Sequence, residues 1–160
     1  MREIREVTIP DMAVLSVRHE HVRVEQLPGL IGGGFAALAA YAAANGGEIA
    51  DEPFVAFYGM GKDGHLDETD MSIEIAFPLR AAIAGQGEVE CREWPGTDAL
   101  QVTYKGDYDK GMIEVYERML GRIEARGDVF LGSSREAYLT GPETPPSEQM
   151  TVITMPFRRA

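Results

Sequence analysis

A single carboxylate interrupts an apolar strand pattern near the middle of this sequence. Residues 71–77 alternate apolar side chains with Ser72, Glu74 and Ala76. Because side chains alternate between the two faces of a strand, Glu74 must point away from the face made by its apolar neighbours. A buried carboxylate is costly unless it is paired or hydrogen-bonded, so Glu74 is a candidate to meet a cation or to act as a general acid or base. The alternative is a strand-edge acid on a solvated face.

Aromatic side chains supply the second candidate chemistry. The chain has six tyrosines, six phenylalanines and one tryptophan. Aromatic walls bind flat or cationic ligands by stacking and cation–π attraction, and core packing is the competing role for each ring. The candidates that lie in or beside predicted strands, or at the start of the second predicted helix, are Tyr58, Trp94, Tyr104, Tyr108 and Tyr138.

Other motifs carry weaker chemistry. Residues 59–64 match G-x-G-x-x-G, but polar residues and another strand follow instead of the helix that a dinucleotide site needs, so a hairpin loop is expected. His19 and His21 could both ligate a metal from one strand face, with no third ligand evident. We therefore expect neither a metal nor a cofactor. The single cysteine, Cys91, cannot form an internal disulfide, which favours a reducing cytoplasm.

The overall charge limits the partners. The 160 residues carry a net charge of -11, and 44% of them are hydrophobic. Proteins that bind nucleic acid usually present a basic face, so direct nucleic-acid binding is not expected, whereas an acidic surface favours cationic ligands or simple solubility. We expect no stretch to approach the roughly 20 apolar residues of a bilayer helix. These features predict a cytoplasmic protein without a membrane partner.

Two helices are predicted to position these side chains. Apolar residues at helical spacing predict the first over 28–44. Three consecutive glycines at 32–34 are unusual there, because each costs about 1 kcal/mol against alanine in a helix interior, unless the backbone approaches a sheet or a ligand closely. The second helix is predicted over 108–126, with Asp107 as its N-cap and Gly127 after its end.

The remaining segments read as strands, and their order repeats. The predicted strands are 13–19, 54–59, 71–77, 99–104, 136–140 and 150–157, with Pro78 stopping the third. Strand, helix, strand and strand follow one another twice, at 12–78 and at 98–156. Residues 74–78 align with 152–156, and residues 13–17 align with 99–103. Chance similarity between two amphipathic β patterns is the alternative.

The repeat predicts a single α+β domain over residues 1–160. Repeat one covers about 7–80 and repeat two about 88–158. Each would form a pseudo-symmetric β-α-β-β unit, an antiparallel sheet with a helix on one side. Pairing the repeats would leave a ligand cleft between them, and a cleft at such a junction is a usual small-molecule site. Glu74 would line this cleft as an unpaired acid.

The order and spacing of several short motifs are similar to those of a known family. The motifs are Pro53 to Tyr58, Asp70 to Pro78 through Glu74, Gly106-Asp107-Tyr108, Glu136-Ala137-Tyr138 and Thr151 to Pro156. Through them the chain resembles, over roughly 7–157, the GyrI-like small-molecule-binding proteins, which are related to effector-binding domains of AraC-type and multidrug-sensing bacterial regulators. The resemblance implies two strand–helix–strand–strand repeats around a ligand cleft. This chain differs from the family at Val152, where family members often have a glutamate that contacts the ligand. Glu74 could take the place of that glutamate from the opposite sheet.

The resemblance implies one leading function and two alternatives. The leading one is non-enzymatic binding of hydrophobic, aromatic or cationic small molecules by Glu74 and the five aromatic candidates, linked to transcription regulation or toxin resistance. The first alternative is hydrolysis of reactive cyclopropane-bearing electrophiles, with Glu74 directing water and Tyr138 or Tyr104 donating a proton or hydrogen bond. The second is restraint of DNA gyrase through the acidic surface. A homodimer or a regulator protein as partner stays open.

Overall fold

Two units make up the chain, and each is an antiparallel sheet with one long helix. The computed structural model describes residues 3–107 and 111–160. Unit 1 comprises residues 1–9, 58–66 and 97–160, and unit 2 comprises residues 10–57 and 67–96. The mixture of helices and antiparallel strands confirms the predicted α+β class.

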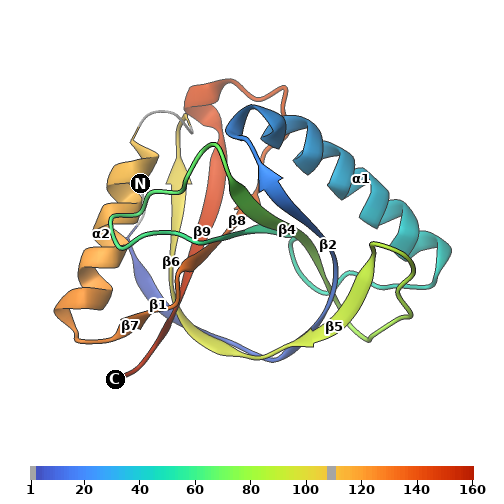
Figure 1. Ribbon diagram of the computed structural model, residues 1–160, viewed down its shortest axis with the longest axis horizontal. Helices are drawn as coiled ribbons and strands as arrows, with labels where there is room; N and C mark the ends of the chain where they lie inside the picture. Colours follow the sequence, from blue (N-terminus) through green and yellow to red (C-terminus); the bar gives the residue numbers. More distant parts are fainter. Residues whose placement is uncertain (1–2, 108–110) are drawn as a thin grey trace. The chain divides into compact units, whose positions relative to one another are not determined.

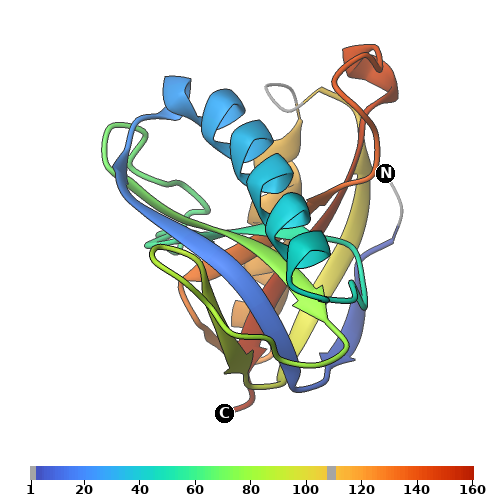
Figure 2. The ribbon, with the colours of Figure 1, turned by 90° about the vertical axis from the view of Figure 1, so that its right-hand side faces the viewer.

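In unit 2 the strands are ordered β3-β4-β2-β5. Its elements are β2 (Met12–Val22), the 3-10 helix η1 (Val24–Gln26), α1 (Leu27–Ala44), β3 (Phe54–Tyr58), β4 (Met71–Leu79) and β5 (Glu90–Trp94). Helix α1 lies across β2 and β4 (Figure 2) and buries Gly34, Leu38 and Ala42. The helix predicted over 28–44 is therefore confirmed.

In unit 1 the strands are ordered β8-β9-β6-β1, and β7 also pairs with β9. Its elements are β1 (Arg5–Ile9), β6 (Thr97–Lys105), α2 (Met112–Ala125), β7 (Val129–Phe130), β8 (Ser133–Tyr138), η2 (Pro146–Glu148) and β9 (Met150–Arg158). Helix α2 lies beside β6 and β9 (Figure 1), and its apolar stripe packs in one core with residues of both strands. The buried stripe is Met112, Val115, Tyr116, Met119, Leu120 and Ile123.

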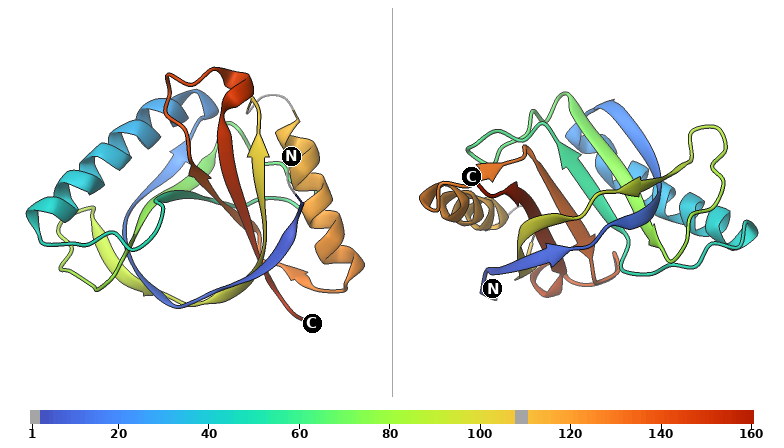
Figure 3. Two further views of the ribbon diagram at one scale, coloured as in Figure 1. Left: turned by 180° about the vertical axis from the view of Figure 1, so that it is seen from behind. Right: turned by 90° about the horizontal axis from the view of Figure 1, so that it is seen from below.

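The two units repeat one topology, including an exchange of leading strands. Both β-α-β-β repeats form, as β2-α1-β3-β4 and as β6-α2-β8-β9. The strand ahead of repeat one, β1, pairs with β6 of repeat two (Figure 3), whereas the strand ahead of repeat two, β5, pairs with β2 of repeat one. Each leading strand thus closes the sheet edge of the other repeat, which explains why residues 1–9 belong to the same unit as repeat two and why β5 belongs to the same unit as repeat one.

Cross-strand pairing aligns the first strands of the two repeats one residue away from the alignment predicted from the sequence. Val14 lies opposite Pro78 in unit 2, and Ala99 lies opposite Pro156 in unit 1. If the two prolines are equivalent, Val14 corresponds to Ala99, so the alignment of 13–17 with 99–103 is wrong by one position. A slip of one residue interchanges the two faces of a strand, and only cross-strand pairing reveals it.

Three details of the predicted elements need correction. The second helix begins at Met112 with Gly111 at its N-cap, where a left-handed φ of 86° favours glycine, so the start at 108 and the cap at Asp107 are wrong. Strand β4 runs through Pro78 to Leu79, because these two residues still pair with Val14 and Ala13 of β2, so the predicted stop at Pro78 is wrong. The sequence reading also missed β1, β5 and β7.

The three glycines of α1 have different surroundings. A Cβ atom on Gly34 would lie 2.2 Å from Cδ1 of Ile75, whereas one on Gly32 or Gly33 would meet nothing within 4 Å. The helix therefore approaches the sheet closely at Gly34, which is the reason that the sequence reading offered for the glycines. Gly32 and Gly33 lie on the exposed side of α1.

One segment is longer and more apolar than the sequence reading allowed. Residues Val24–Ala44, which comprise η1 and α1, form a 21-residue segment long and apolar enough to cross a membrane, with 11% of its most apolar window buried. The expectation that no stretch approaches about 20 apolar residues is therefore wrong. The match is one of length and composition only, and in unit 2 the same helix packs on the sheet.

Candidate ligand-binding site

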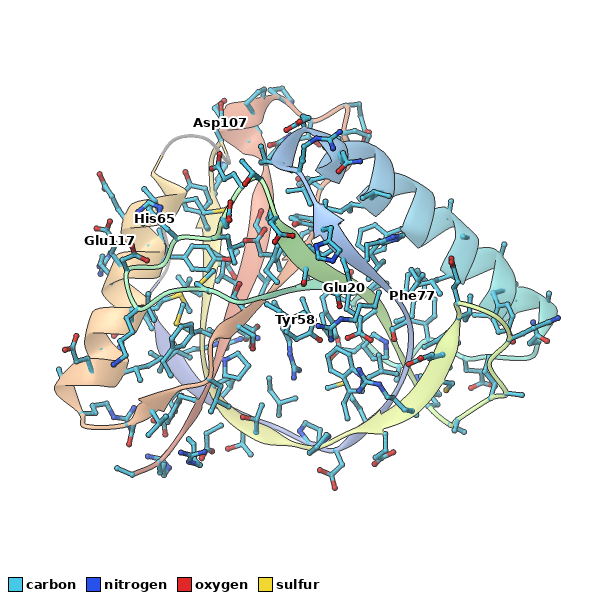
Figure 4. The ribbon with its side chains drawn as sticks, in the orientation of Figure 1. Glu20, Tyr58, His65, Phe77, Asp107 and Glu117 are labelled. Carbon is cyan, nitrogen blue, oxygen red and sulfur yellow. The ribbon has the colours of Figure 1, made fainter. Side chains whose placement is uncertain are left out.

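Strand β4 separates an apolar face from a polar one. Ile73 and Ile75 are fully buried, and Ile75 lies against α1 at Gly34. The Phe77 ring lies 6.0 Å from that of Phe35 on the same helix, and Figure 4 labels Phe77 on this strand. The predicted helix-facing side of this strand is therefore confirmed. Glu74 points to the opposite face, yet it is only 1% exposed. A carboxylate buried to this degree needs partners.

Glu74 has partners on both neighbouring strands of unit 2. The Ser16 hydroxyl on β2 donates to Oε2 of Glu74 at 2.6 Å. The Nη2 atom of Arg92 on β5 lies 3.2 Å from Oε1 and 3.1 Å from Oε2. The carboxylate is thus ion-paired as well as hydrogen-bonded, which corrects the expectation of an unpaired acid. Charge-assisted hydrogen bonds of this kind offset the cost of burial.

Aromatic rings complete the site around Glu74. The guanidinium carbon of Arg92 lies 5.1 Å from the centroid of the Trp94 ring, within the range of a cation–π contact. The Trp94 ring in turn meets Phe54 edge-on, with centroids 5.6 Å apart. Trp94 is buried, whereas the Arg92 side chain is 46% exposed. We call Ser16, Phe54, Glu74, Arg92 and Trp94 the Glu74 site.

The Glu74 site can hold a planar cation between a carboxylate and an indole ring. The chain's own guanidinium occupies that position, and it also lies 3.8 Å from the exposed Glu90. The cation is therefore held by one buried acid, one exposed acid and one aromatic face. In unit 1 the position that corresponds to Glu74 is Val152, so the second repeat brings no matching charge.

Unit 1 holds a second buried carboxylate, on the helix-facing side of its sheet. Glu136 of β8 accepts hydrogen bonds from the hydroxyls of Tyr116 on α2 and, at 2.9 Å, of Tyr138 on β8. The Tyr116 hydroxyl also lies 3.2 Å from the hydroxyl of the buried Ser134. Burial raises the pKa of Glu136 above its ordinary value of 4.5, and the two tyrosine hydrogen bonds oppose that shift. Burial and the neighbouring Glu136 raise the pKa of Tyr116 well above 10.

Replacement of Glu136 by glutamine is expected to change how stability depends on pH. Because the pKa of Glu136 is higher in the folded state, folding takes up a proton at pH values above 4.5. The contribution of this carboxyl to the free energy of unfolding therefore falls as the pH rises from 4.5 toward the folded-state pKa, by at most about 1.4 kcal/mol per pH unit. Glu136→Gln should therefore gain stability relative to the wild type as the pH rises above 4.5. Urea unfolding at several pH values measures this, and a difference that stays constant as the pH rises would contradict it.

The structure groups only some of the predicted site residues. Glu74 and Trp94 belong to one site in unit 2. In unit 1, Tyr104 and Tyr138 both lie opposite Thr151 of β9, where the Tyr104 hydroxyl donates to the Asp107 carbonyl at 2.9 Å and Tyr138 contacts Glu136. Their hydroxyls are thus engaged within the sheet–helix layer.

The two remaining candidates are Tyr58 and Tyr108. Tyr58 ends β3 and lies near Arg135, whose pKa is lowered by burial against the opposing effect of this tyrosine. Tyr108 lies outside the described residues. The sequence reading missed Ser16, Phe54 and Arg92. A signal for Arg92 was present, because it precedes Trp94 by two residues and would share its face in a strand.

Solved structures share this fold. The EcmrR C-terminal domain is 21% identical with a TM-score of 0.80, over 99% of this chain and 98% of that one. EcmrR in its DNA complex is 22% identical with a TM-score of 0.80, and there this chain covers 99% of its own length but spans only 58% of the EcmrR chain.

Two more distant structures have the same fold. A hydrolase encoded by lin2189 from Listeria innocua is 13% identical with a TM-score of 0.67, over 98% of this chain and 92% of that one. SAV2435 bound to tetraphenylphosphonium is 14% identical with a TM-score of 0.59, over 98% and 94%. At these identities the likeness establishes the fold alone.

The family is established by a match across nearly the whole sequence. No curated protein matches this chain. The model of the GyrI-like small molecule binding domain matches residues 2–158, which confirms the resemblance inferred from the sequence motifs. The chain belongs to the GyrI-like small-molecule-binding domain family.

Proposed function

We propose that the Glu74 site binds aromatic small molecules, cationic ones among them, and that the chain acts as an effector-binding domain in the bacterial cytoplasm. One observation carries the proposal. A guanidinium lies 5.1 Å from the Trp94 ring and within 3.2 Å of the Glu74 carboxylate, as a planar cationic ligand would lie. Family membership supports small-molecule binding. Tetraphenylphosphonium, the ligand of SAV2435, is a suitable probe of this class.

The contacts of Glu74 favour binding over hydrolysis. A carboxylate that directs water must offer an oxygen to that water in the reacting complex. Both Glu74 oxygens accept from Arg92, and Oε2 also accepts from Ser16. Such a carboxylate is well placed to hold a charge in position. The link to transcription regulation, with a regulator protein or a second copy as partner, is part of the same proposal.

Trp94→Leu is expected to weaken probe binding about tenfold, because stacking and cation–π contacts are worth about 0.5–2 kcal/mol. Isothermal titration calorimetry with tetraphenylphosphonium and with the neutral triphenylphosphine oxide measures the effect. The control is Tyr41→Leu, which removes an aromatic ring from α1 of the same unit, where the Tyr41 hydroxyl bonds the Ala84 carbonyl. Equal affinities in wild type and a folded Trp94→Leu variant would rule out this site.

A further inference from the structure

We propose that Arg92 determines the charge specificity of the Glu74 site by occupying the place of a ligand's cation. The inference rests on the proposed function, since it concerns ligands of the same site. Arg92 satisfies the buried carboxylate and covers the Trp94 ring, so a cationic ligand has to displace it. A neutral aromatic ligand can use the rings without breaking the ion pair.

The position of Arg92 would allow a ligand to displace its guanidinium from Glu74. Its side chain is 46% exposed, whereas that of Glu74 is 2% exposed, so the acid is fixed inside the unit and the guanidinium comes from the solvent side. Strand β5 contributes an exposed second acid, Glu90, 3.8 Å from Nε of Arg92. When a ligand displaces the guanidinium from Glu74, Glu90 can retain it on the same strand.

The burial of Glu74 raises the cost of leaving its carboxylate without a partner, so Arg92 and a cationic ligand compete for it. Glu74 is only 1% exposed, so any group that replaces Arg92 there has to carry a compensating charge or hydrogen bond. Ser16 supplies one hydrogen bond throughout. Arg18 also lies opposite Glu74 on β2, where it bonds Glu20 at 2.5 Å, whereas Arg92 contacts both oxygens of the Glu74 carboxylate and sets the balance between cationic and neutral ligands.

The test uses three phenyl-bearing probes of different charge. They are tetraphenylphosphonium, triphenylphosphine oxide and tetraphenylborate, titrated calorimetrically into the full chain at fixed ionic strength. Arg92→Gln should raise tetraphenylphosphonium affinity about tenfold and leave triphenylphosphine oxide within about twofold, because a hydrogen bond to a charged group is worth about a factor of ten when it is half exposed.

The matched control is Arg80→Gln. Arg80 lies in the same unit and is 67% exposed, with Glu48 at 3.7 Å, so its loss changes the net charge equally without touching the site. Arg80→Gln should change tetraphenylphosphonium affinity by less than about twofold. The gain in Arg92→Gln should vanish in the double variant Glu74→Gln/Arg92→Gln.

A second variant keeps the proposal testable if Arg92→Gln folds poorly. Glu74→Gln removes the buried charge and leaves Arg92 beside Trp94, so tetraphenylborate should bind more tightly and tetraphenylphosphonium more weakly than in the wild type. An Arg92→Gln effect no larger than that of Arg80→Gln, or an unchanged charge preference in Glu74→Gln, overturns the role of Arg92.

The two proposals fail in different ways. If triphenylphosphine oxide binds in a Trp94-dependent manner while charge preference ignores Arg92, the proposed function stands and the role of Arg92 is wrong. If none of the three probes binds to wild type or variants, the proposed function fails, and the role of Arg92 fails with it.

Discussion

Tyr116→Phe is expected to lower the free energy of unfolding by about 2–3 kcal/mol at neutral pH, because it removes a hydroxyl that donates to a buried carboxyl. Glu136 is 9% exposed and cannot recover that hydrogen bond from bulk water. The same change also removes the contact to Ser134 at 3.2 Å. The phenylalanine ring keeps the packing of α2 on the sheet, so the loss reports on the hydroxyl rather than on a cavity.

The control for this change is Tyr41→Phe, which also deletes one tyrosine hydroxyl. That hydroxyl donates to a neutral carbonyl, Ala84 O at 2.7 Å, near the surface. Its loss should cost about 0.5–1.5 kcal/mol. Urea unfolding followed by circular dichroism measures both variants. A Tyr116→Phe variant no less stable than Tyr41→Phe would mean that the hydrogen bond to Glu136 contributes no more than the one to the Ala84 carbonyl.

Gly34→Ala and Gly33→Ala are expected to change stability in opposite directions. A methyl group at Gly34 would overlap Cδ1 of Ile75 at 2.2 Å and approach two further side-chain atoms of that residue at 3.3 and 3.4 Å. Overpacking of a core costs about 1–3 kcal/mol, and the gain in helix propensity of about 1 kcal/mol offsets only part of it. At Gly33 the methyl group meets nothing within 4 Å, so the propensity gain remains.

The two substitutions are matched, since they add the same methyl group to adjacent residues of one helix. Thermal unfolding should therefore give a midpoint below that of the wild type for Gly34→Ala and above it for Gly33→Ala. Similar midpoints for the two variants would show that Ile75 moves aside without cost and that the close approach of α1 to β4 is not specified by Gly34.

The orientation of β4 was predictable because it depends on local alternation alone. Ile73, Ile75 and Glu74 occupy opposite faces whatever the rest of the fold does. The close contact at Gly34 was likewise foreseeable, since a run of glycines inside an apolar helix needs a reason other than helix propensity. Family membership followed from the order of several motifs, each of them weak alone.

The partners of Glu74 were not predictable from local pattern. Arg92 lies on β5, whose residues 90–94 are too charged to resemble a buried strand, although charge is common on edge strands. The pairing of β5 with β2 depends on the exchange of leading strands between repeats, which no periodicity encodes. The one-residue error in aligning the repeats has the same origin, because register is fixed by cross-strand pairing.

The indole signal of Trp94 in a two-dimensional ¹⁵N–¹H NMR titration with triphenylphosphine oxide shows whether an aromatic ligand binds at the Glu74 site. The chain has one tryptophan, so one indole resonance reports on the Glu74 site. We expect a saturable shift of that resonance, with the dissociation constant found by calorimetry. We also expect the shift to be lost in a Phe54→Ala variant, since the Phe54 ring meets that of Trp94 at 5.6 Å. Calorimetric binding that leaves the Trp94 resonance unmoved would contradict binding at this site, because the ligand would then bind elsewhere.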